Sequence, residues 1–263
     1  MVAWVVVMTH LPDDWIPFSI LEPSSRAENL SMIVRKLVYS SFSTLAQLNA
    51  WVHHGREYSA PIRPDRIIWL DPQVVQRKSA TKPPSNAVRK PLVVGGEWDR
   101  ELVPFADDIV YEALFQHFEE GASWERTGYV EFLSTGVSEH GNVAPEKAFE
   151  RCRKLDSLYS YLSTNGYRSQ SDLERTGELL HDFEISILPP RFREIAVNIT
   201  RDGEFVWDGG IHRLVMAQLL DVDRIPVRVN IRHRGWQVIR EAAYNGIDVP
   251  AFHDHEDVEY LLR

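Results

Sequence analysis

The hydrophobic positions between residues 195 and 232 change their spacing along one continuous stretch. Residues 195–200 alternate apolar and polar side chains, which is typical of a half-buried strand, and an Arg-Asp-Gly turn separates them from a second short strand that ends at Trp207. From Ile211 to Val222 the apolar residues recur at helical spacing. Residues 225–232 alternate again. The pattern therefore predicts a hairpin, a helix and a strand in succession.

Further elements are predicted outside this segment. Apolar residues at helical spacing indicate helices over residues 30–52, with a division near residue 40, and over residues 107–120. Residues 66–71 and the apolar run that begins at Leu92 are each typical of a strand. Together these elements predict an α+β fold with a small mixed sheet. We expect a largely helical extension over residues 1–65, a core over residues 66–234 with a helical insertion at about residues 100–155, and a C-terminal tail over residues 235–263.

The composition is that of a globular protein without disulfide bonds. Of its 263 residues, 44% are hydrophobic and 25% are charged, which is unlike a disordered chain. Its single cysteine, Cys152, excludes an intramolecular disulfide, and we expect a reducing, cytoplasmic location. The formal net charge of -9 opposes binding to bulk nucleic acid. The apolar residues 2–8 are too few to span a bilayer, so we interpret them as a core strand and expect no membrane association.

The predicted helix begins with a motif suited to binding an anion. The segment reads Asp-Gly-Gly-Ile-His-Arg, and the first turn of a helix carries unpaired backbone N–H groups and the positive end of the helix dipole. Gly209 and Gly210 would let a ligand approach the backbone, and His212 and Arg213 add side-chain donors. The alternative is that the glycines only make the turn and that Arg213 pairs with a carboxylate such as Asp208.

This order of elements, with Asp-Gly-Gly-X-His-Arg between a strand and a helix and Ile-Pro-Val in the next strand, resembles the ParB/sulfiredoxin-like superfamily. The resemblance covers roughly residues 155–233, in which residues 158–167 look like a short helix of that superfamily, and residues 66–72 resemble its opening strand. It implies a nucleotide-binding fold in which the glycine turn and the His-Arg pair contact phosphates. Those contacts would fall here on Gly209, Gly210, His212 and Arg213.

The chain departs from individual branches of that superfamily. Ile211 stands where a sulfiredoxin has its reactive cysteine, and Cys152 is distant in sequence, so we do not expect reduction of a sulfinic acid. The partition proteins carry a paired-arginine box and a helix-turn-helix domain, for which the segment after residue 234 is too short, so we expect no specific binding to duplex DNA. The kinase branch uses a glutamate as general base. Glu194 is the candidate here, although an exposed charge at a strand edge is the commoner explanation.

The sequence therefore supports two classes of function. One is a nucleotide-dependent phosphotransferase acting on a small hydroxylated substrate, and the other is a non-catalytic, nucleotide-responsive regulatory or nucleic-acid-associated module. The expected ligand is a nucleoside di- or triphosphate, ATP or ADP rather than CTP, and Mg2+ would accompany it. The candidate catalytic residues are His212, Glu194 and His233. The candidate nucleotide-binding residues are Asp208, Gly209, Gly210, Ile211, His212, Arg213 and Arg232.

A second group of chemically capable side chains lies near the C-terminus. Residues 253–257 read His-Asp-His-Glu-Asp, and such side chains can bind metal ions. Neighbouring residues of an extended segment point to opposite sides, so we interpret this run as an exposed polar tail and assign no metal ligands. The pattern leaves the oligomeric state open.

Overall fold

The computed structural model describes residues 25–81, 83, 93–135, 143–177 and 188–262, and the chain forms two compact units, Met1–Ser41 and Phe42–Arg263. Helix α2 (Ser25–His54) belongs to both units and is continuous, so the division predicted near residue 40 is wrong. The strand predicted over residues 2–8 lies outside the described residues. No helix in the described ranges is long and apolar enough to cross a membrane.

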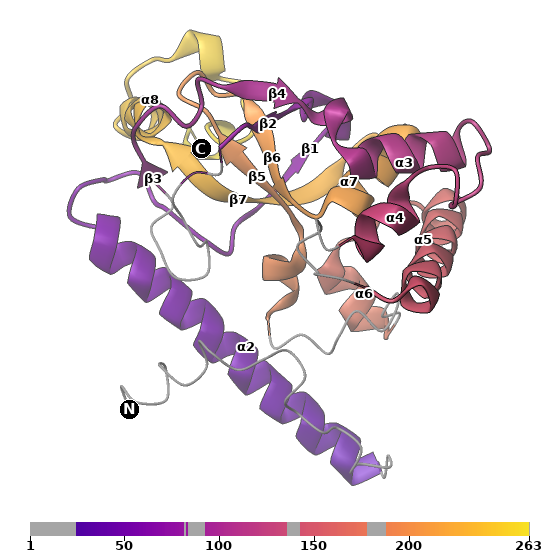
Figure 1. The fold of residues 1–263 in the computed structure, drawn as a ribbon. Coiled ribbons are helices and arrows are strands. Elements are labelled where there is room, and N and C mark those ends of the chain that lie inside the picture. Colours follow the sequence, from indigo (N-terminus) through magenta and orange to yellow (C-terminus); the bar gives the residue numbers. More distant parts are fainter. Residues whose placement is uncertain (1–24, 82, 84–92, 136–142, 178–187, 263) are drawn as a thin grey trace. The chain divides into compact units, whose positions relative to one another are not determined.

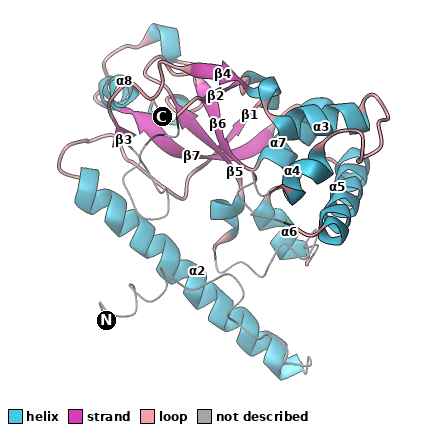
Figure 2. Cartoon of the chain, viewed as in Figure 1, coloured by secondary structure: helices cyan, strands magenta, loops and turns pink. Residues whose placement is uncertain are grey.

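The second unit is built on one mixed sheet with helices around it, which confirms the predicted α+β fold. In the view of Figures 1 and 2, helices α3 to α7 gather at one side of the strands and α8 lies at the other. The strands are β1 (Ile67–Leu70), β2 (Arg77–Ser79), β3 (Val93–Val94), β4 (Leu102–Pro104), β5 (Ile195–Ile199), β6 (Phe205–Gly209) and β7 (Ile225–His233). The helices are α3 (Ile109–Phe118), α4 (Tyr129–Ser134), α5 (Pro145–Asn165), α6 (Gln170–Thr176), α7 (Ile211–Leu219) and α8 (Arg234–Tyr244).

The strand order is β1-β7-β5-β6-β2-β4, and β3 pairs with the far end of β7. Strands β5 and β6 form the predicted hairpin, α7 follows it, and β7 returns parallel to β5. The predicted succession of hairpin, helix and strand is therefore confirmed. Strand β1 pairs antiparallel with the first half of β7, although the two are far apart in sequence.

Helix α7 buries the apolar face that its sequence predicts. Leu214 and Val215 are fully buried, together with Met216 and Ala217, in a core that also contains Val197 and Val227 from the two central strands. Burying a side chain of this size contributes about 2 kcal/mol to folding. The helix is therefore fixed against the sheet, and its first residue follows directly on the glycine turn.

Three helices, α3, α4 and the first part of α5, lie in the segment predicted as a helical insertion. Helix α3 packs on α7, and α4 and α5 pack on each other. Aromatic rings join these helices, with the rings of Phe118 and Tyr159 stacked at 3.9 Å between centroids. Helix α5 ends at Gly166, which has a φ of 72°, so the short helix expected over residues 158–167 is the last part of this longer helix.

The C-terminal segment packs on the sheet, which corrects the expectation of an exposed polar tail. Asp257 is fully buried and accepts hydrogen bonds from Arg232 Nε at 2.8 Å and from Trp236 Nε1 at 2.9 Å. The Arg240 guanidinium lies 3.1 Å from the same carboxylate. Burial alone would raise the pKa of Asp257, but the two guanidinium groups hold it well below its usual range. The segment therefore supplies the counter-charge for a buried arginine of β7.

Candidate functional site

The register of four neighbouring strands places the glycine turn at a defined end of the sheet. Ile67 of β1 is paired with Arg228 of β7, Arg228 with Ala196 of β5, and Ala196 with Gly209 of β6. These residues therefore form one row across the sheet, with neighbours about 4.8 Å apart. Because β6 runs antiparallel to β5, the residue that precedes β5 emerges beside the start of α7, and β1, which is antiparallel to β7, ends on that side.

Gly210 closes the turn and lies against β5. It is exposed, it has a φ of 80°, and it is the N-cap of α7. A Cβ atom added to Gly210 would lie 3.2 Å from the Cα atom of Ile195, which is closer than nearly all real contacts. The turn thus requires glycine for conformational and steric reasons, as the alternative interpretation of the motif holds. Gly210 is therefore at the surface where α7 begins, and the first-turn N–H groups that follow it have no intrahelical partner.

Asp208 takes part in a polar cluster inside the sheet and does not pair with Arg213. Its carboxylate accepts hydrogen bonds from Asn198 Nδ2 at 3.1 Å and from Asn230 Nδ2. Arg228 donates in turn to Asn230 Oδ1. Burial lowers the pKa of Arg228, and the charge of Asp208 opposes that shift. Asp208 therefore balances a buried positive charge beneath the turn.

Arg213 points into the protein, where it meets Glu194. Its Nη2 atom donates to the backbone carbonyl of Arg193, and its Nη1 atom lies 3.6 Å from Glu194 Oε2. Arg213 therefore does pair with a carboxylate, as the alternative interpretation holds, but the partner is Glu194 and not Asp208. The motif arginine and the candidate base, which lie apart in the sequence, are brought together by the fold.

Glu194 is buried, which corrects its interpretation as an exposed charge at a strand edge. The residue is 4% exposed, and its Oε1 atom accepts a hydrogen bond from the backbone N–H of Gln170 at 2.6 Å. Its Oε2 atom has no hydrogen-bond partner among the described residues. Burial raises the pKa of Glu194 to about 7, in spite of the neighbouring Arg213 guanidinium. A carboxyl with this pKa can both accept and release a proton near neutral pH.

His212 is held by a tyrosine from the helical insertion. Its Nε2 atom lies 2.8 Å from the hydroxyl of Tyr129, a residue that is 1% exposed. Burial raises the pKa of Tyr129 to about 12, so the hydroxyl keeps its proton. Helix α4 thus fixes the orientation of the motif histidine.

A cavity of about 330 Å³ opens beside Glu194. Part of its wall comes from the segment that enters β1, and part comes from the start of α6 and the turn before β5. The polar side chains at its wall include Arg63, Asp65, Arg66, Ser169, Arg191 and Glu194. Its volume is at the lower end of the range for small-molecule sites. Glu194 is the one member of the predicted site that lines it.

The other two predicted residues, Arg232 and His233, lie at the opposite end of the sheet. They follow Arg228 by four and five residues along β7, which corresponds to about 13–17 Å of strand. Arg232 is enclosed by its ion pair with Asp257. The structure therefore does not bring these residues to the glycine turn.

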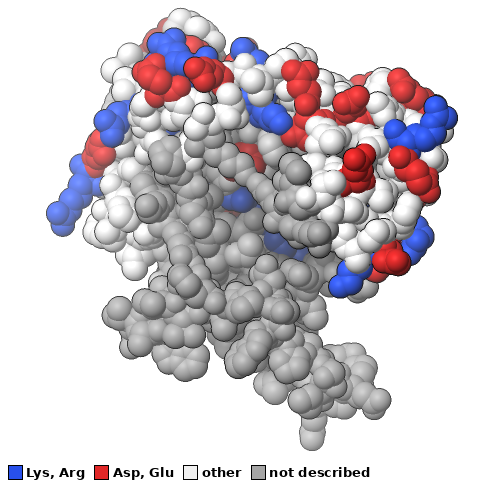
Figure 3. All heavy atoms as spheres, in the orientation of Figure 1, with Lys and Arg blue, Asp and Glu red and all other residues white. Residues whose placement is uncertain are grey.

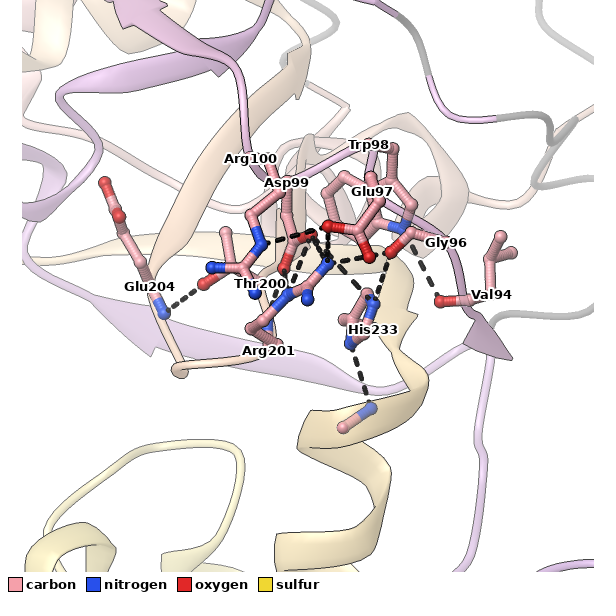
Figure 4. Close-up of polar contacts among 11 residues, drawn as sticks. Val94, Gly96, Glu97, Trp98, Asp99, Arg100, Thr200, Arg201, Glu204 and His233 are labelled. Carbon is pink, nitrogen blue, oxygen red and sulfur yellow. Dashed lines mark hydrogen bonds and ion pairs between the residues drawn. The ribbon is translucent and has the colours of Figure 1, made fainter.

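Figure 4 shows what surrounds His233 instead. Its Nδ1 atom accepts from the N–H of Gly235 at 2.9 Å, and its Nε2 atom lies 2.9 Å from the carbonyl oxygen of Gly96. Beside it, Asp99 is bound by Arg201 through hydrogen bonds of 2.6 to 3.1 Å. Burial would raise the pKa of Asp99, but Arg201 brings it down to about 2. One ring nitrogen of His233 therefore caps helix α8, and the other contacts the loop at Gly96.

Sequence reasoning missed several residues of the site. Tyr129 lies in a helix with no motif, and the cavity arginines come from two distant segments, the loop before β1 and the turn before β5. A usable signal was present for Asn198 and Asn230, because polar residues in central strands need buried partners. Within the described parts of the chain, no group of three or more His, Cys, Asp or Glu side chains could hold a metal ion. Comparison with protein-family models, curated proteins and solved structures gave no match.

Proposed function

We propose that the protein binds a nucleoside di- or triphosphate at the N-terminus of α7 and transfers a phosphoryl group to a small hydroxylated substrate, with Glu194 as general base. The position of Glu194 carries this proposal. Its buried carboxyl lines a cavity, and it directly precedes Ile195, the residue that contacts Gly210. A base with a pKa of about 7 suits proton transfer from a hydroxyl at neutral pH.

The remaining groups of the motif have distinct roles in this proposal. The first-turn N–H groups of α7 and the helix dipole would hold phosphate oxygens at the exposed turn. His212, held in place by Tyr129, would contribute an imidazole beside the phosphates. Arg213 would keep Glu194 beside the turn and contribute positive charge. ATP or ADP is proposed ahead of CTP, and Mg2+ would enter with the nucleotide.

Calorimetry with ATP, ADP, CTP and GTP, each with Mg2+, tests the binding step. We expect heat of binding for at least one nucleotide, and slow turnover once an acceptor is supplied. Binding without turnover over a broad panel of acceptors would favour the non-catalytic, nucleotide-responsive alternative. If millimolar nucleotide gives no heat of binding, the motif is only a strand-to-helix turn and the proposal is wrong.

A pair of variants of equal size locates the nucleotide. Ile211→Glu places a negative charge at the first residue of α7, and Ile211→Gln has nearly the same shape without the charge. We expect the charged variant to bind nucleotide at least about tenfold more weakly than the neutral one, because like charges repel at short range. If the two variants bind nucleotide with equal affinity, the phosphates do not bind at the turn. Arg213→Ala should weaken binding roughly thirtyfold, and its unfolding must be measured in parallel because Arg213 also contacts Arg193.

The proposal includes a cytoplasmic location and no sequence-specific binding to duplex DNA. On the face shown in Figure 3, acidic and basic side chains are interspersed over the described surface. The net charge of -9 also disfavours a polyanion. A gel-shift assay at physiological salt should show no retention. Sequence-dependent retention at submicromolar protein would overturn this part of the proposal.

A further inference from the structure

The cavity beside Glu194 is lined by more positive than negative side chains. Three arginines, Arg63, Arg66 and Arg191, face two carboxylates, Asp65 and Glu194. Of these carboxylates, Asp65 is bound by Gln47 at 3.0 Å and lies 4.0 Å from Arg191. Glu194 already has a positive neighbour in Arg213, an arginine that does not line the cavity. The cavity therefore has an excess of guanidinium groups, which bind oxyanions through paired N–H donors.

Arg66 is held in a fixed orientation. The centre of its guanidinium lies 3.3 Å above the ring of Tyr260, which restricts the plane of the group. Its Nε atom is buried and has no hydrogen-bond acceptor in the described part of the chain. A buried N–H donor without a partner is uncommon and costly in a folded protein. Arg66 thus lies at the cavity wall in a fixed orientation, with hydrogen-bonding capacity that no described residue takes up.

Glu194 provides a second and independent observation at the same cavity. Its side chain is 1% exposed, and its Oε2 atom has no hydrogen-bond partner among the residues described. An ionised carboxylate oxygen accepts a hydrogen bond from any hydroxyl that comes within reach of it. The cavity thus combines guanidinium donors for an anion with the nearly enclosed carboxyl of Glu194 at its wall.

We propose that this cavity is the acceptor-substrate site, and that its substrate is a small molecule carrying an oxyanion, either carboxylate or phosphate, together with a hydroxyl group. This inference rests on the proposed function. Arg66 and Arg191 bind the oxyanion, and the hydroxyl faces Glu194. In the transfer step, Glu194 takes the hydroxyl proton while the hydroxyl oxygen forms a bond to the terminal phosphorus of the nucleoside triphosphate. The bond from that phosphorus to its bridging oxygen breaks, and the nucleoside diphosphate leaves.

Three probes of similar size test the site in the full-length protein without nucleotide. D-glycerate carries a carboxylate and hydroxyls, glycerol 3-phosphate carries a phosphate and hydroxyls, and glycerol is the neutral control. We expect one of the two anions to bind with a millimolar or lower Kd by calorimetry, while glycerol gives no heat. The anion that binds identifies the oxyanion. Equal binding of glycerol, or no binding of either anion, overturns the proposal.

Arginine variants connect the binding to this cavity. Arg191→Gln and Arg66→Gln should each weaken binding of the anion by about tenfold. Arg191 is 60% exposed, so its replacement leaves the fold intact even if Arg66→Gln does not. Arg175→Gln is the matched control, because Arg175 is an exposed arginine of α6 that does not line the cavity. Unchanged affinity in Arg191→Gln overturns the proposal.

Nucleotide titrations separate this inference from the function on which it rests. If nucleotide binds and neither anion does, the phosphate site at α7 survives and the acceptor site is wrong. If an anion binds and nucleotide does not, the cavity is a ligand site and the phosphotransferase proposal is wrong. When both bind, Glu194→Gln should keep the affinity for the anion within about threefold and abolish transfer.

Discussion

The Nη1 atom of Arg213 lies 3.6 Å from the Oε2 atom of Glu194, and both atoms are buried without a hydrogen-bond partner within the described ranges. The motif arginine and the proposed base thus form one ionic unit. Any ligand that draws the guanidinium toward the turn leaves the carboxyl less stabilised as an anion. Occupancy of the turn and the proton affinity of Glu194 are therefore coupled.

The titration of Glu194 should be visible in the pH dependence of stability. Because burial raises its pKa from 4.5 to about 7, the folded protein binds this proton more tightly than the unfolded chain does. The stabilisation is fully present below the unfolded pKa and is lost as pH rises through the folded value, a change on the order of 3 kcal/mol. Glu194→Gln should flatten the free energy of unfolding over that interval, measured by urea titration at each pH. Glu120→Gln, at an exposed position, should retain the wild-type slope.

The contact between Tyr129 and His212 can be measured by a double-mutant cycle. Tyr129→Phe removes a buried hydroxyl that lies 2.8 Å from the imidazole, and His212→Ala removes its partner. We expect a coupling free energy of about 1 kcal/mol from chemical unfolding of the two single variants and the double variant. Tyr159→Phe is the control, since its hydroxyl reaches Glu119 only at 3.4 Å and at the surface. A coupling free energy near zero would mean that Tyr129 does not hold the motif histidine.

A comparison of alanine variants at Gly210 and Gly121 separates the steric requirement for glycine at the turn from the conformational one. Both have a positive φ, 80° and 71°, but only at Gly210 would a Cβ atom meet a neighbour, the Cα atom of Ile195 at 3.2 Å. Gly121→Ala should lower the free energy of unfolding by about 1 kcal/mol. Gly210→Ala should lower it by roughly 1–3 kcal/mol more, because the backbone of β5 must move. Equal losses would show that the turn has room for a side chain.

Asp257→Asn should be among the most damaging single changes in the chain. It keeps the shape of the side chain but removes the negative charge shared by Arg232 and Arg240. We expect a loss of roughly 3–5 kcal/mol in the free energy of unfolding, since buried guanidinium groups remain uncompensated. Asp254→Asn, three residues earlier and exposed, should change it by less than about 0.5 kcal/mol. A similarly small effect at Asp257 would show that water reaches the arginines.

The core of the fold was predictable from sequence because its pieces are contiguous. The period of the apolar residues changes from two to 3.6 and back between Ile195 and Ile231, and each change marks an element boundary. The pairing of β1 with β7 was not predictable in this way. Pairing between strands so far apart in sequence depends on how the whole chain folds, and the pattern of a short sequence segment carries no information on it.

The candidate site was predicted only at its backbone. The Gly-Gly turn and the helix after it follow from local rules, and the structure places them as expected. The burial of Glu194 depends on Gln170 and the cavity wall, which belong to other segments. A charged residue ahead of a strand looks exposed until those segments are known. His233 was misleading for the opposite reason, because it follows the motif closely in sequence but emerges at the far end of β7.

The ion pair between Arg232 and Asp257 also links two segments of the chain in folding. Strand β7 holds a guanidinium in the middle of the sheet, and the carboxylate that compensates it belongs to the C-terminal segment. Burying the guanidinium without that carboxylate would be strongly unfavourable. We therefore expect the sheet and the segment that carries Asp257 to fold and unfold as one cooperative unit.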